Sequence, residues 1–169
     1  MNWFTGTRSQ AINGIESRGD AEFLMRTKNA LRMLMSAPQF GVIQAHVTVI
    51  RQGKRSGMKA WAAKPTFVVG TATWKYSTIW YAGAIAHDAY HAKLYRDAKS
   101  ASRGAKPGAD TWTGSEAEKQ CLAFQKQVLA HLGADQKTIA YIERCEEEPT
   151  YQGQNTGWRS WLDYLRRWW

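Results

Sequence analysis

The sequence predicts an α+β fold, in which a small antiparallel or mixed β-sheet packs on a long central helix and a helical part follows toward the C-terminus. Residues 42–73 are rich in β-branched, partly alternating side chains, which is typical of strands. Residues 78–100 and later segments have apolar side chains at helical spacing instead. Since 169 residues are enough to bury one core, we expect a single domain over residues 1–169.

The first half of the chain is expected to hold one helix and the strands. Residues 1–18 have no clear period, which predicts an irregular lead-in. Apolar side chains at helical spacing predict a helix from Asp20 to Ser36, which Pro38 ends. Strands are expected at residues 42–50 and 65–73, with a charged turn at residues 52–57 and a short third strand at residues 58–62.

The second half is expected to be helical. Residues 78–100, capped by Ser77 or Thr78, begin almost wholly apolar and end charged. This helix should therefore start buried and end in solvent, with a Ser-, Gly- and Pro-rich loop after it. Further helices are expected at residues 115–132, 135–146 and 157–169, the last with a stripe of Trp and Leu side chains.

The chain is strongly basic, with a net charge of +9. A basic surface favours anionic partners such as nucleic acid or an anionic membrane. The Lys and Arg residues are scattered, however, and no cluster matches a known DNA-reading motif. Charge alone therefore identifies no partner.

Cysteine use and the N-terminus favour a cytoplasmic protein. Cys121 and Cys145 are too few for a disulfide framework, and Cys121 lies in an apolar helical pattern that predicts a buried, reduced thiol. The N-terminus lacks the charged start and long apolar run of a secretory signal. No run of residues approaches the length of a membrane span.

The segment His87-Asp88-Ala89-Tyr90-His91 contains two of the four histidines in the chain. Histidines four residues apart lie on one face of a helix and can bind one metal ion. A third ligand must come from another element, and the next helix offers Glu116 and Glu118. Glu118 begins the inward, apolar stripe of that helix whereas Glu116 lies off it, so Glu118 is the better candidate.

Residues 84–92 and Glu118-Lys119-Gln120-Cys121 resemble the gluzincin metallopeptidases, whose pattern is H-E-x-x-H on one helix and E-x-x-A, with some small-residue variation, on a later one. Among these, the compact minimal gluzincins are most similar, over about residues 40–132. The resemblance implies a zincin-like domain in which His87, His91 and Glu118 bind Zn²⁺. It also implies hydrolysis of an amide bond in a peptide or protein substrate, with Asp88 as the general base.

Asp88 departs from the family pattern, which has Glu at this position. The Asp side chain is one methylene shorter, and a displacement of about 1 Å can cost on the order of 100-fold in rate. The oxyanion donor stays open among Tyr90, Tyr95, His131 and Tyr151. Residues 67–73 are expected to bind an extended peptide by strand pairing at the sheet edge.

Two other functions stay open. His87-Asp88 in an apolar helix resembles the doublet of the metal-dependent HD-type phosphohydrolases, but that family is all-helical and needs an upstream His, for which only His46 is present. The basic charge and the Trp-rich tail also suit a non-catalytic binding or effector module.

Four features have a structural alternative. The two histidines could be half-buried polar residues, and Ser115 with Glu118 matches a helix capping box. His46 is expected to be structural. The helix at residues 157–169 could close the core, dock a partner, or lie on a membrane with its arginines near the headgroups.

Overall fold

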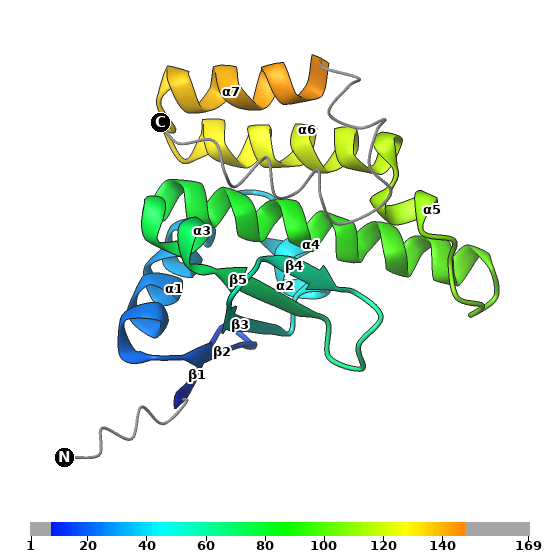
Figure 1. The fold of residues 1–169 in the computed structure, drawn as a ribbon, viewed down its shortest axis with the longest axis horizontal. Coiled ribbons are helices and arrows are strands. Elements are labelled where there is room, and N and C mark those ends of the chain that lie inside the picture. The colour runs from blue at the N-terminus through cyan, green and yellow to red at the C-terminus, as the bar shows by residue number, and fades with distance from the viewer. Residues whose placement is uncertain (1–7, 148–169) are drawn as a thin grey trace.

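The described residues form an α+β fold around a five-stranded mixed sheet (Figure 1). The structure is a computed structural model that describes residues 8–147, so the predicted helix at residues 157–169 and Tyr151 lie outside the described residues. The strands are β1 (Arg8–Ile12), β2 (Ile15–Gly19), β3 (Val49–Gly53), β4 (Gly57–Lys59) and β5 (Thr66–Gly70). The helices are α1 (Ala21–Leu34), α2 (Phe40–His46), α3 (Thr71–Tyr76), α4 (Thr78–Ala101), α5 (Asp110–Thr113), α6 (Ser115–His131) and α7 (Gln136–Glu147).

The strands lie in the order β1-β2-β3-β5-β4. The three central strands are parallel, while β1 pairs antiparallel with β2 and β4 pairs antiparallel with β5. β5 is therefore paired on both sides, and β4 forms one edge of the sheet. The expectation that residues 67–73 offer a free edge is wrong, because β4 covers that side of β5.

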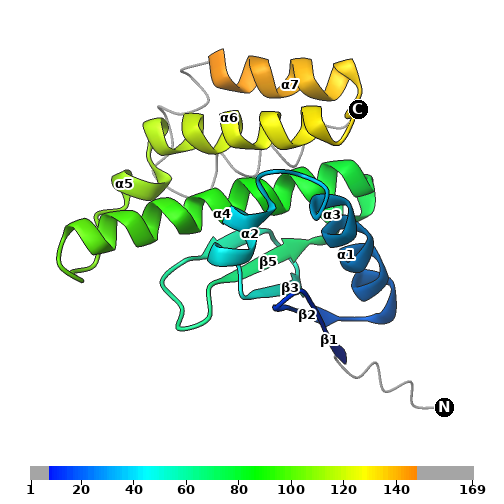
Figure 2. The same ribbon diagram turned by 180° about the vertical axis from the view of Figure 1, so that it is seen from behind.

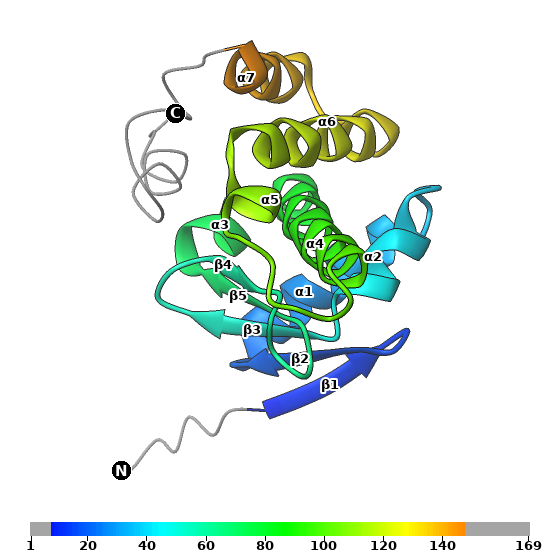
Figure 3. The same cartoon turned by 90° about the vertical axis from the view of Figure 1, so that its right-hand side faces the viewer.

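Helices cover one face of the sheet and continue away from it in layers (Figures 1 and 2). Alternate strand residues such as Ile15, Ile50 and Phe67 are fully buried and share one core with residues of α1, α2 and α4. The residues between them, such as Glu16 and Arg18, are partly exposed on the other face. α6 packs on the side of α4 away from the sheet, and α7 packs on α6 (Figure 3). α4 is thus the central element of the molecule.

The long central helix is confirmed almost to the residue. α4 runs from Thr78 to Ala101, and the Ser77 side chain caps it by accepting a hydrogen bond from the Trp80 amide at 3.0 Å. Its residues from Trp80 to Ala89 are all buried, and its C-terminal part is largely exposed. Among the described residues, none of the helices combines the length and the apolar character needed to cross a membrane.

The shorter helices mostly follow the sequence pattern as well. Asp20 caps α1 through the Phe23 amide at 2.8 Å, and Asp135 accepts from the Thr138 amide at 2.7 Å at the start of α7. α6 begins at Ser115, as expected. The loop between α4 and α6 contains one element that was not expected, the single turn α5.

Two sequence predictions are wrong in the first half. Residues 8–18, predicted as irregular, form the β1–β2 hairpin around Asn13-Gly14, whose φ angles of 49° and 80° suit a two-residue turn. Residues 42–50, predicted as a strand, hold the end of α2 before β3 begins at Val49. Ile43 is buried within α2, so tertiary packing overrides the β propensity of this segment.

The strand predicted at residues 65–73 is also shorter than expected. β5 ends at Gly70, where an added Cβ would lie 3.2 Å from the Ser56 amide nitrogen. The chain then turns into α3, and the short strand predicted at residues 58–62 is present as β4. The sheet thus ends close to the start of α4.

Candidate metal centre

The candidate site lies in the seam between α4 and α6, which run antiparallel. Gly83 faces Leu129 across this seam, so closely that a Cβ on Gly83 would lie 2.8 Å from Leu129 Cδ2. One helical turn further along α4, His87 faces Gln125. The next turn of α4 carries His91, which faces Glu118. The seam therefore changes from apolar to polar along its length.

His87, His91 and Glu118 converge on one point. The two Nε2 atoms are 3.1 Å apart. Glu118 Oε1 lies 3.4 Å from His87 Nε2, and Glu118 Oε2 lies 3.2 Å from His91 Nε2. Both histidines are buried, and the Glu118 side chain is 19% exposed. The carboxylate is therefore the most solvent-exposed of the three groups.

Hydrogen bonds on the far side of each imidazole determine which nitrogen faces the site. His87 Nδ1 lies 3.0 Å from Gln125 Oε1, and His91 Nδ1 lies 2.7 Å from the Trp112 carbonyl oxygen. Both oxygens accept hydrogen bonds, so both Nδ1 atoms donate. In the neutral imidazoles, both Nε2 lone pairs are then directed into the site, as metal-binding histidines require.

The spacing of these atoms fits a small tetrahedral ion. With metal–nitrogen distances of about 2.0–2.1 Å, two ligands of a tetrahedral zinc ion lie roughly 3.3 Å apart. The two Nε2 atoms are 3.1 Å apart, and each lies within 3.4 Å of one Glu118 oxygen, so the three side chains are close enough together to bind one such ion. Two imidazoles and one carboxylate are also a common donor set for zinc.

The electrostatics favour a positive charge at the same point. Burial would lower the pKa of His91, but Cys121 and Glu118 offset it and hold that pKa well above its usual value. Burial would raise the pKa of Glu118, but the two histidines hold it below its usual value. These two shifts have opposite directions, and both favour a positive charge beside the Glu118 carboxylate, the charge that a metal cation would also supply.

Asp88 is buried beside the histidines. It is 2% exposed, and its Oδ2 atom has no hydrogen-bond partner among the described residues. Burial raises the pKa of Asp88 to about 6, although His87 and His91 partly oppose this rise. An unsatisfied buried carboxylate oxygen next to a group of side chains that could bind a metal is the kind of exception that calls for a functional explanation.

Cys121 belongs to the same group of side chains. The ligand atoms of His87, His91 and Cys121 all lie within 4.8 Å of one another, and all three residues are buried. The prediction of a buried thiol is confirmed, since Cys121 is fully buried and forms no disulfide. Its position among the histidines was not expected, because the apolar stripe around it favoured a core residue. The described residues thus contain a buried cluster that could hold a metal ion.

Glu118 does not serve as the acid of a capping box. Gly114, rather than Ser115, is the N-cap of α6. The Glu118 carboxylate lies against the histidines rather than at the start of the helix. Glu116 is exposed, so it does not compete for the site.

The other predicted residues lie elsewhere. His46 is at the end of α2. Its pKa is lowered by burial and by the charge of Arg96, a residue of α4 that lies more than one turn beyond His91. His131 Nε2 bonds the Ser36 carbonyl oxygen at 2.9 Å, near the far end of α6. Tyr90 packs on Phe124, with the ring centroids 4.7 Å apart. None of the contacts described for these three residues reaches His87, His91 or Glu118.

An aromatic cluster that the sequence did not reveal adjoins the site. Trp112, whose carbonyl oxygen accepts the His91 hydrogen bond, packs edge-on against Tyr95 and Trp61 at 5.2 and 5.8 Å between ring centroids. Trp61 follows β4 and is 58% exposed. The cluster therefore links the edge of the sheet at β4 to the Trp112 carbonyl, which orients the candidate ligand His91.

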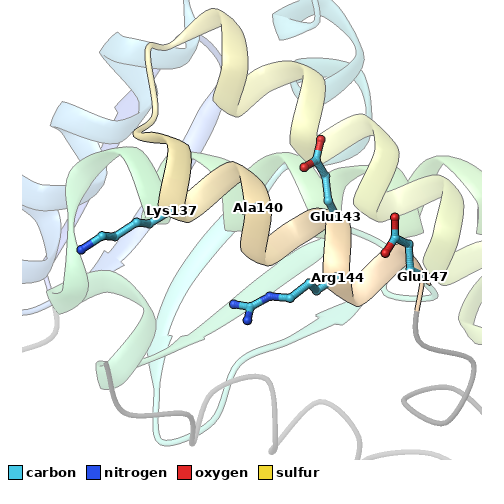
Figure 4. Close-up of a pocket in the computed structure, with 5 residues that line it drawn as sticks. All are labelled: Lys137, Ala140, Glu143, Arg144 and Glu147. Carbon is cyan, nitrogen blue, oxygen red and sulfur yellow. The ribbon is translucent and has the colours of Figure 1, made fainter.

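A separate hollow lies along α7, shown in Figure 4. It is lined by Lys137, Ala140, Glu143, Arg144 and Glu147. All five residues come from one helix, and none belongs to the α4–α6 site. The hollow brings no chemistry to the metal-binding atoms.

Comparison of the chain with protein-family models, curated proteins and solved structures found no match. What the site can do is therefore inferred from its own side chains.

Proposed function

We propose that the chain is a zinc-dependent, metallopeptidase-like hydrolase of peptide or amide bonds. The observation that carries this proposal is the convergence of His87, His91 and Glu118, with both Nδ1 atoms already donating elsewhere. A buried, unpartnered Asp88 oxygen beside them supplies a candidate general base. This combination suits metal-assisted hydrolysis.

Each residue of the site would have one role. His87, His91 and Glu118 hold the ion, while Gln125 and the Trp112 carbonyl fix the ring orientations. Zinc bound there would lower the pKa of water and polarise the substrate carbonyl. Asp88 accepts a proton from the attacking water and passes it to the leaving amine, and a pKa of about 6 suits this exchange near neutral pH.

The edge of the sheet offers a place for an extended peptide. β4 pairs only with β5 among the described residues, and it packs against α4. An extended chain could add to its free edge through main-chain hydrogen bonds. Trp61, just beyond β4, would then contact the peptide next to Trp112 and the metal ligands. A peptide is therefore the substrate class that we favour.

The HD-type alternative is less well supported. That family is all-helical, whereas the described residues include a five-stranded sheet. The upstream histidine that it needs, His46, interacts with Arg96 and Asp97 rather than with His87.

Elemental analysis of the purified full chain tests the metal. We expect about one zinc ion per chain, lost in the H87A/H91A double variant. H131A is the matched control, because His131 is exposed and bonds only the Ser36 carbonyl among the contacts described for it. A wild-type protein that binds no zinc and is unaffected by chelator would sink the proposal.

Hydrolysis is tested separately on a library of quenched fluorescent peptides. The zinc-loaded wild type should cleave at least part of the library, and D88N should lose that activity by about 100-fold or more. A zinc-loaded protein that cleaves no peptide would leave the metal centre standing and refute the peptidase role.

A further inference from the structure

We propose that the Cys121 thiolate is a fourth protein ligand of the metal, which makes the resting centre closed. This inference rests on the metal binding proposed above but not on hydrolysis. It is carried by the position of Cys121 within the group of metal-binding atoms.

The geometry of α6 brings Cys121 to the site. Cys121 follows Glu118 by three residues, so both side chains lie on one face of the helix. Glu118 contacts both imidazoles, and the Cys121 sulfur lies within 4.8 Å of the ligand nitrogens of the same two histidines. A sulfur ligand and a nitrogen ligand of one zinc ion lie about 3.6 Å apart. The sulfur is therefore within about 1.2 Å of the separation that joint coordination of one zinc ion needs.

Cys121 is fully buried, at 0% exposure. A cysteine that binds zinc does so as the thiolate, so metal binding would remove the thiol proton. When the sulfur–metal bond forms, the S–H bond breaks and the proton is released to solvent. The cation then supplies the positive charge that stabilises the thiolate.

Four protein ligands change what the centre does. His87, His91, Glu118 and Cys121 would fill a tetrahedral site, as in zinc sites that hold structure rather than react. Water reaches the metal only when the thiolate leaves or a fifth ligand adds. A thiolate also favours zinc or cobalt over magnesium, calcium or manganese. Cys121 would thus close the resting centre to water and select its metal.

Cys145 provides a matched control. It is equally buried, at 3% exposure, but it packs with Trp80, Leu122, Tyr141 and Ile142 in the apolar cluster between α4, α6 and α7. Cys121 and Cys145 are the only cysteines of the chain. Any sulfur signal from a bound metal can therefore be assigned by comparing two single variants.

The test is the absorption spectrum of the full chain loaded with Co²⁺. Wild type and C145S should show the visible bands of tetrahedral cobalt and a near-ultraviolet thiolate-to-cobalt charge-transfer band. C121S should keep visible bands and lose the charge-transfer band. Visible bands without a charge-transfer band in wild type, or loss of that band in C145S, would overturn the Cys121 assignment alone.

The wild-type spectrum tests whether a cysteine binds the metal even if C121S does not fold. A wild type that binds no cobalt overturns this inference together with the proposed metal centre. Where C121S folds, competition with a chromophoric chelator gives a second readout. Its zinc affinity should fall by at least about tenfold, the loss that even an outer partner of a ligand can cause. An unchanged affinity would contradict direct ligation.

Discussion

The two ends of the α4–α6 seam are built by the same helices and are both largely buried, yet their chemistry is opposite. At one end Gly83 and Leu129 pack without any polar group, beside a cluster of Trp80, Leu122 and Tyr141. At the other end His87, His91 and Glu118 meet with Asp88 nearby. The first end is complete by itself, whereas the second buries ionisable groups that a bound cation would balance.

The two ends of the seam contribute to the free energy of folding in different ways. Apolar packing stabilises by about 25 cal/mol for each Å² removed from water, whatever its partners. A buried charge costs several kcal/mol unless it is paired. The polar end should therefore be a weak point of the metal-free protein and a strong point of the metal-bound one. Substitutions at the two ends should separate these contributions.

The largest effect is expected from E118A. Removing one partner of a buried charged group costs about 3–5 kcal/mol, and the loss of a ligand should lower zinc affinity by more than about 100-fold. E116A is the matched control, because Glu116 is exposed on the same turn of α6. Isothermal titration with zinc measures both variants. Equal affinities for E118A and wild type would show that Glu118 is not a ligand.

The effect of D88N on the stability of the metal-free protein should depend on pH. Because the folded pKa of Asp88, about 6, is above the ordinary 3.8, the Asp88 carboxyl contributes a loss of stability to the metal-free protein as pH rises from about 4 to about 6. The loss reaches about 3 kcal/mol and persists at higher pH. D88N keeps the size of the side chain without its charge, so it should be more stable than wild type at pH 7 and equal at pH 4.

Urea unfolding of the metal-free proteins at several pH values measures this difference. D97N is a suitable control, since Asp97 is exposed on the same helix. A stability difference between D88N and wild type that does not change with pH would mean that the Asp88 charge is not what destabilises the polar end.

Metal removal should lower the stability of the protein slightly less than the Asp88 charge does. At a zinc concentration 100 times the dissociation constant, binding stabilises a protein by about 2.7 kcal/mol, which corresponds to roughly 5–10 °C in Tm for a chain of this size. Chelator should therefore lower the Tm of wild type by that amount. In the H87A/H91A variant, chelator should leave the Tm unchanged, and a similar fall there would place the metal elsewhere in the protein.

Only some of the residues at the polar end of the seam could be identified from the sequence. His87 and His91 could be found because their spacing alone places them on one face, and Glu118 because it begins the inward stripe of α6. Cys121 lies on that same stripe and therefore looked like a core residue. Gln125 lies on the same stripe, but neither it nor the Trp112 carbonyl could be identified as the support of an imidazole, since that depends on how α5 and α6 dock on α4.

The same limit explains one of the two main errors in the fold. The capped helices α1 and α4 were predictable because their start signals are local. α2 was missed because its β-branched residues are held in a helix by packing, with Ile43 fully buried. The β1–β2 hairpin, in contrast, had a local signal in Asn13-Gly14 between two isoleucines.

The smallest effect is expected from G83A, at the apolar end. The new Cβ would meet Leu129 Cδ2 at 2.8 Å and Cγ at 3.0 Å. Such overpacking costs about 1–3 kcal/mol, of which the better helix propensity of Ala offsets about 1 kcal/mol. G83A should therefore lower the free energy of unfolding by about 1 kcal/mol. G41A is the control, since Gly41 lies in α2 with no atom near its Cβ position, and it should not destabilise the protein.

If the two ends of the seam are independent, G83A should bind zinc as tightly as wild type. A fall in zinc affinity of about tenfold or more would instead mean that the spacing set by Gly83 positions His87, one turn away.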